Sequence, residues 1–194
     1  TSSASSPGQM VLPASISEIS GTSTGGLDML GSSDDGYLAL SEIESGGKPS
    51  LRHSYVEYVI GFDVPQAQTV VFHAEAHRPE NSDGDDFMFQ YSTDNVDFVS
   101  LSTVTSSADS IYEANVFVKS PTQLYLRIVD TDRSEGHGSL DQLFLDQVYL
   151  EIDGEPLPPD TIFVHDVWVQ QDGGPGNKFR SLAHVTVHNQ RDNP

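Results

Sequence analysis

The sequence contains no cysteine, a single tryptophan and few basic residues. Without cysteine, neither a disulfide framework nor thiolate chemistry is available. Nine Lys and Arg residues stand against 29 Asp and Glu residues, which gives a formal net charge of -20. This charge argues against nucleic acid and anionic membranes as partners, because phosphate binding requires the opposite sign. No apolar run approaches the ~20 residues of a membrane-spanning helix, so we expect no membrane insertion.

The acidity has two interpretations. One is solubility in a salty or extracellular medium, and the other is that divalent cations hold part of the charge. A calcium ion can also tie loops together where a disulfide might, so the lack of cysteine is compatible with a secreted or cell-surface bacterial protein. Because the chain opens at Thr1 rather than Met, we expect it to be a processed or excised piece.

Short stretches of alternating apolar and polar residues run through the middle of the chain, the pattern of strands that bury one face. Gly, Pro, Asn and Asp separate them and favour turns, and no stretch has a stronger helical period. We predict strands over 37–40, 55–64, 69–77, 87–91, 96–101, 112–119, 123–130 and 143–152. We expect two hairpins among them, 87–91 with 96–101, which would have an acidic tip, and 112–119 with 123–130. Such short, evenly spaced strands predict an all-β fold, an antiparallel jelly-roll β-sandwich with a short C-terminal β extension.

Composition divides the chain into three segments. Residues 1–34 are rich in Ser, Thr and Gly, and we expect a linker or a loosely docked edge there. Residues 35–155 hold the predicted sandwich. Residues 156–194 begin with a stiff Pro-rich connector and contain two further strand patterns, at 161–169 and 182–188. Because two strands rarely stand free in water, they either dock on the sandwich or open a further domain cut at the end of this chain, and we favour the second.

Acidic residues gather at the ends of the expected strands. Hard cations such as Ca²⁺ take six to eight oxygen ligands, often from loops in which Gly permits tight bends. The candidate calcium ligands in two such loops are Asp83, Asp85, Asp86, Asp130, Asp132 and Asp141. The alternative is that these residues cap turns by accepting hydrogen bonds from backbone N–H groups. The antiparallel order also leaves open whether the two loops meet at one end of the sandwich.

Three blocks of sequence resemble an ancillary β-sandwich module of large secreted bacterial proteins, of the galactose-binding or carbohydrate-binding-module type. They are LSEIESGGKPS, DGDDFMFQYSTDNVDF and IVDTDRSEGHGSLDQLFLDQVYLEI. The ending, HDVWVQQDGGPGNKFRSLAHVTVHNQRDNP, is similar to the first strands of an immunoglobulin-like domain. The resemblance implies a glycan ligand and neighbouring domains of a larger polypeptide as partners. It also implies a structural calcium shared by a Glu-x-Glu pair and an Asp of the last strand, here Glu42, Glu44 and Asp146 (or Asp141).

A second metal hypothesis concerns His73, Glu75 and His77, which alternate and so project from one face of a strand. They could hold zinc if a neighbour supplied a fourth ligand. We prefer a polar outer face. Tyrosines and Trp168 could stack on a sugar, but most of these rings fall in alternating strands, where core packing is the default.

For catalysis the sequence offers little. It has no Gly-x-Ser-x-Gly elbow, no P-loop and no Cys–His spacing. Acidic residues are too numerous for any pair to indicate glycoside hydrolysis. We therefore predict no enzyme but a calcium-stabilised accessory module of an extracellular bacterial protein that binds carbohydrate. The alternatives are a structural or adhesive spacer that engages other protein domains and, less favoured, a glycoside-acting hydrolase domain.

Overall fold

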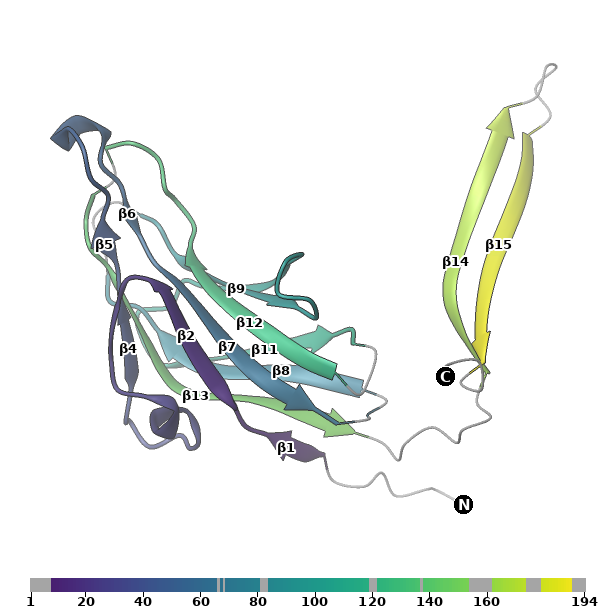
Figure 1. Cartoon of the computed structure of the whole chain (residues 1–194), viewed down its shortest axis with the longest axis horizontal. Coiled ribbons are helices and arrows are strands. Elements are labelled where there is room, and N and C mark those ends of the chain that lie inside the picture. Colours follow the sequence, from purple (N-terminus) through teal and green to yellow (C-terminus); the bar gives the residue numbers. More distant parts are fainter. Residues whose placement is uncertain are drawn as a thin grey trace. The chain divides into compact units, whose positions relative to one another are not determined.

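The alternating stretches form two antiparallel sheets that pack face to face as a β-sandwich (Figure 1). The five-stranded sheet has the order β10-β9-β12-β7-β2, and the six-stranded sheet has the order β11-β8-β13-β4-β3 with β1 also paired to β13. The first comprises Val99–Val104 (β10), Phe87–Ser92 (β9), Thr122–Asp130 (β12), Glu57–Val64 (β7) and Ser15–Ser20 (β2). The second comprises Ser110–Val116 (β11), Thr69–His77 (β8), Gln142–Asp153 (β13), Leu38–Ser41 (β4), Thr22–Thr24 (β3) and Gln9–Val11 (β1). The predicted all-β sandwich is confirmed.

The structure, a computed structural model, describes residues 8–65, 67, 69–80, 84–118, 122–136, 138–153, 162–173 and 179–189, the last two ranges as backbone only. Within these ranges, short elements complete the fold: the strand pair Ile43–Glu44 (β5) and Ser54–Tyr55 (β6), and the 3-10 helices Leu27–Leu30 (η1) and Pro49–Leu51 (η2). None of the described helices is long and apolar enough to cross a membrane.

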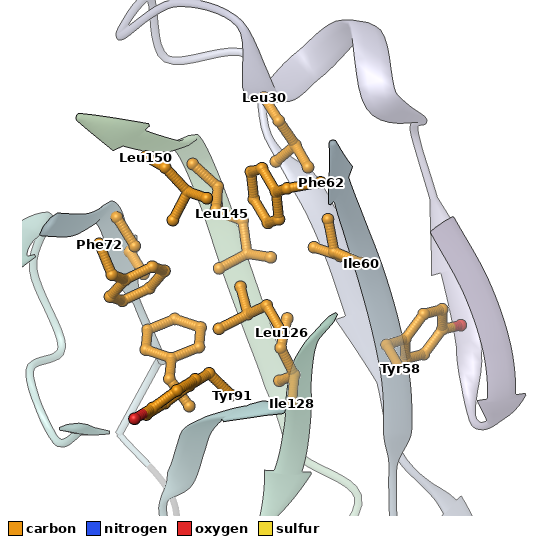
Figure 2. Close-up of a cluster of buried hydrophobic side chains, with 14 of the residues drawn as sticks. Leu30, Tyr58, Ile60, Phe62, Phe72, Tyr91, Leu126, Ile128, Leu145 and Leu150 are labelled. Carbon is orange, nitrogen blue, oxygen red and sulfur yellow. The ribbon is translucent and has the colours of Figure 1, made fainter. Parts of the chain in front are cut away.

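The core lies between the inner faces of the two sheets (Figure 2). On β8, Phe72, Ala74 and Ala76 face inward and are at most 1% exposed, as their spacing of two predicts. Phe89 of β9 is fully buried and meets Phe72 edge to face across the sandwich, with ring centroids 5.2 Å apart. The inward residues of β7 and β12, among them Ile60, complete the opposite wall.

Of the two expected hairpins, the structure contains one. The 87–91 stretch does pair with the strand that follows it, as β9 with β10, and the acids at 85 and 86 lie at the open end of this hairpin instead of at its turn. The expected hairpin of 112–119 with 123–130 is wrong. β11 pairs with β8 in one sheet, whereas β12 pairs with β7 and β9 in the other, so the chain crosses between layers. Alternation shows that a strand buries one face but not which sheet it joins.

The Ser-rich N-terminal part supplies edge strands to both sheets. β2 pairs with β7, β3 pairs with β4, and β1 pairs with β13. Leu30, in η1, is fully buried in the core. Burial of this side chain and the backbone pairing of three strands offset the ordering entropy of a segment that has few other apolar residues.

The chain divides into two compact units, Thr1–Glu155 and Pro156–Pro194. In the second, Ile162–Gly173 (β14) and Phe179–Asn189 (β15) form an antiparallel hairpin, with a register shift between Val164 and Asp166. The two predicted strands of this segment are therefore present. Its assignment as the start of an immunoglobulin-like domain stays a prediction.

Candidate metal site

Four acidic side chains come together where strands of both sheets end. In the five-stranded sheet, β12 ends at Asp130, which is in register with Phe87 at the start of β9, just after Asp85. In the six-stranded sheet, β4 ends next to Glu42 and pairs with the start of β13, just after Asp141. The two acidic loops therefore lie at the same end of the sandwich, which the sequence left open.

Glu42, Asp85 and Asp141 form the centre of this cluster. One carboxylate oxygen of each lies within 4.8 Å of those of the other two. Glu42 and Asp85 are each 3% exposed. The backbone fixes two of the three relative to each other: the Glu42 N–H donates to the Asp141 carbonyl at 3.1 Å, and the Asp141 N–H donates to Glu42 Oε2 at 2.9 Å.

The second oxygen of Glu42, Oε1, is buried and has no hydrogen-bond partner among the described residues. Burial is the main cause that raises the pKa of Glu42 to about 7, and the nearby carboxylates of Asp130 and Asp141 add to the rise. The backbone N–H of Asp141 and the nearby Ser54 hydroxyl oppose it. Ser54 is itself fully buried, and its Oγ forms no well-aligned hydrogen bond within the described part of the chain, so it offers a further oxygen.

Asp130 borders the cluster with a fully buried side chain. Its Oδ1 accepts from Arg133 Nε at 2.7 Å, while its Oδ2 is buried without a hydrogen-bond partner among the residues described. Burial raises the pKa of Asp130, and the Arg133 guanidinium only partly opposes that rise. Arg133 also donates to the Val56 carbonyl at 2.9 Å, so both Asp130 and the backbone hold its guanidinium in place.

The chemistry of this donor set fits a hard divalent cation. Burying several carboxylates without a compensating charge costs free energy, and the orphaned oxygens of Glu42 and Asp130 are unpaired acceptors of the kind that a cation satisfies. All the donors are oxygens, which suits Ca²⁺ or Mg²⁺ better than zinc or copper. The arrangement can bind one ion and thereby tie the ends of the two sheets together.

The other predicted ligands lie apart from this centre, and each has a partner of its own. Asp86 pairs with Arg78, with Arg78 Nε 2.6 Å from Oδ1. Asp132 Oδ1 accepts from the Ser134 N–H at 2.8 Å, the turn-capping role that was the alternative. Asp83 lies outside the described residues.

The structure separates the two glutamates of the Glu-x-Glu pair. Glu42 belongs to the cluster, whereas Glu44 points to Arg52, with its Oε2 2.8 Å from Nη1. Asp146 is 1% exposed in β13 and accepts from the backbone N–H groups of Asp34 and Asp35 at 3.2 and 3.3 Å, so it fastens that turn. The candidates for the aspartate were Asp146, in β13, and Asp141, directly before β13. The structure places Asp141 beside Glu42.

The alternating histidines do not converge on one point. His73 lies between Glu113 and Glu151, each 3.2 Å from a different ring nitrogen. His77 Nδ1 is 2.6 Å from Asp109 Oδ1. This is the polar outer face that we preferred to a zinc site. Sequence reasoning missed Ser54, since a serine at the start of a short strand gives no signal that it will be buried beside a carboxylate.

Comparisons with known proteins reveal only distant similarity. No family model matches the chain, and no curated protein matches it. Among solved structures, the carbohydrate-binding module TmCBM61 in complex with β-1,4-galactotriose is similar to it, with 12% identity and a TM-score of 0.41 over 70% of this chain and 86% of that one. A chain from work on endo-acting O-glycanases, with which prominent members of the human gut microbiota initiate mucin breakdown, has 7% identity and a TM-score of 0.41 over 72% of this chain and 92% of its own.

Proposed function

We propose that this chain is a non-catalytic, calcium-stabilised β-sandwich module of an extracellular protein, and that it binds carbohydrate. The convergence of Glu42, Asp85 and Asp141 from both sheets is the observation on which the calcium proposal rests. Extracellular modules bind Ca²⁺ with dissociation constants of about 10⁻⁴ to 10⁻³ M. With an affinity in that range, this site would bind Ca²⁺ outside the cell. The ion would fix the loops, and a ligand surface would then be prepared before the ligand arrives.

Calcium removal tests this proposal directly. A ligand that binds only the folded chain and is present at 100 times its dissociation constant raises the free energy of unfolding by about 2.7 kcal/mol. For a chain of this size, each kcal/mol raises the melting temperature by about 2–4 °C, so we expect a rise of roughly 5–11 °C on adding Ca²⁺ to EDTA-treated protein. Mg²⁺ should give a smaller rise, because it demands a tighter octahedral geometry.

A pair of variants makes the test specific. Glu42→Gln removes a central ligand, whereas Glu44→Gln alters an acid two residues away that pairs with Arg52 on the surface. We expect the calcium-dependent rise to be lost in the first variant and kept in the second. Equal melting curves of the wild-type chain in Ca²⁺ and in EDTA would remove the metal from the proposal.

A structural or adhesive spacer remains the second candidate, and one observation favours it. Two large apolar side chains on or next to the edge strand β11 are largely exposed, Ile111 at 72% and Phe117 at 81%. Such residues beside a free strand edge suit contact with another protein domain. A spacer with no sugar affinity would bind no polysaccharide in the assays described below.

A further inference from the structure

The outer faces of the two sheets differ in how their aromatic rings are used. On the six-stranded sheet, Tyr149 stacks on His73 with ring centroids 4.6 Å apart, and Phe144 stacks on His77 at 5.0 Å. In each pair, one face of each ring is covered by the other ring. A sugar that stacks on an aromatic ring needs such a face, so these rings make the poorer platform.

Tyr125 of β12 has different neighbours. In the antiparallel register it lies between Gly61 of β7 and Ser92 of β9, and Gly61 in turn lies opposite Ser15 of β2. Residues directly opposite each other project to the same side of a sheet, so this row has one large ring among small side chains. The Tyr125 hydroxyl donates to Gln123 Oε1 at 2.8 Å, which holds the ring in place.

Arg127 lies two residues further along the same face, about 7 Å away at the usual rise of a strand. Gln90 Oε1 accepts from its Nε at 2.9 Å and from its Nη2 at 2.7 Å, and the guanidinium sits 4.0 Å from the centroid of the Phe98 ring. Its ion pair with Glu57 is loose, at 3.7 Å. Two of the five guanidinium N–H groups meet Gln90 and Nη1 faces Glu57 only loosely, so the pre-positioned fork can still donate to a further acceptor.

We propose that the outer face of the five-stranded sheet binds a neutral glycan, with a pyranose ring on Tyr125 and adjacent hydroxyl oxygens accepting hydrogen bonds from Arg127. This inference rests on the carbohydrate-binding function proposed above and names its surface and ligand class. The charge of the chain selects a neutral ligand: a net charge of -20 repels acidic glycans, while Arg127 and Glu57 nearly balance each other on this face. Neutral hydroxyl groups incur no such repulsion.

Affinity electrophoresis in calcium buffer tests the surface. The whole chain is run through gels containing soluble neutral polysaccharides (a β-galactan, a xylan and a β-glucan), and through a gel containing anionic polygalacturonate. We expect retardation by at least one neutral polymer, and about tenfold weaker binding for Tyr125→Ala and for Arg127→Ala, since a tenfold change corresponds to about 1.4 kcal/mol. Tyr149→Ala is the matched control on the opposite sheet and should bind as the wild type does.

The outcomes separate this inference from the function on which it rests. Retardation of the wild-type chain by none of the polymers would remove the carbohydrate function itself. Binding by the wild type that survives both Tyr125→Ala and Arg127→Ala, or that is lost in Tyr149→Ala alone, would overturn this surface and leave the function standing. Retardation by polygalacturonate alone would overturn the neutral ligand class. Should Tyr125→Ala fold poorly, Tyr125→Leu keeps an apolar side chain without a ring. Ligand-induced shifts of the Arg127 Nη–H resonances in the wild-type chain then report the contact.

Discussion

Replacing Glu42 with glutamine should reverse its effect on stability according to whether calcium is present. In metal-free protein, burial raises the pKa of this carboxyl to about 7 from its ordinary value of 4.5. A raised pKa means that the folded chain binds the proton more tightly than the unfolded chain does. The stability that this group contributes is therefore complete below pH 4.5 and is lost as the pH rises through 7.

The size of the effect follows from that difference. Each unit of pKa difference between the folded and unfolded chain corresponds to about 1.36 kcal/mol. The ionised Glu42 therefore lowers the free energy of unfolding by about 3 kcal/mol once the pH is well above 7. Glutamine keeps an oxygen that can accept from the Asp141 N–H but has no charge to desolvate. In EDTA at pH 8, we therefore expect the E42Q chain to be more stable than the wild type by up to about 3 kcal/mol, and this gain should vanish near pH 4.

With calcium the order should invert. The ion compensates the buried charge of the wild type, whereas the variant has lost a ligand and gains little. Urea unfolding at pH 4, 6 and 8, in EDTA and in Ca²⁺, measures both effects, and the difference between the two chains cancels the titration of the other carboxylates. A difference that does not change with pH in EDTA, or a variant that calcium stabilises as much as the wild type, would refute the reasoning.

Two further predictions follow from the packing. Phe89→Ala removes a fully buried ring between the sheets and should lower the free energy of unfolding by about 3–5 kcal/mol, as measured by urea unfolding in calcium; a loss below 1 kcal/mol would contradict the core described here. Asp146→Ala leaves two backbone N–H groups of the 34–35 turn without their acceptor and should cost about 1–3 kcal/mol, while calorimetry should find the calcium affinity unchanged. A loss of calcium binding in that variant would mean that Asp146 and not Asp141 completes the site.

Sequence alone could predict the central strands because apolar and polar residues alternate along them, but it did not predict β1, β2 and β3 of the Ser-rich N-terminal part. The inward series Phe72, Ala74 and Ala76 of β8 shows the period of two plainly. The sheet to which a strand belongs was not predictable, since β11 and β12 have the same period and are joined by a short connection, yet they lie in different layers. Only the three-dimensional course of the chain decides that, and local residue patterns do not encode it.

The acidic residues show the same limit at the candidate site. Glu42 and Glu44 flank one isoleucine and are chemically alike, but Glu42 is buried against Asp141 while Glu44 turns to Arg52 at the surface. Asp146 lies in β13 where the register shifts, and it accepts hydrogen bonds from the backbone of Asp34 and Asp35, more than 100 residues away in the sequence. Charge density along the chain predicted a candidate site, but long-range pairing decides which carboxylates form the cluster that could hold an ion.

The position of the acidic cluster ties the two proposals together. Asp85 stands two residues before β9 and Asp130 is the last residue of β12, and these adjacent strands hold Gln90 and Arg127. An ion bound between the ends of β9, β12 and β13 would resist slippage of β9 against β12, and it is their register that sets Gln90 opposite Arg127. The cation would not touch the glycan. It would hold the guanidinium fork in position, so glycan affinity should fall in EDTA even at temperatures at which the metal-free chain is still folded, whereas a cation that only raised global stability would leave that affinity unchanged.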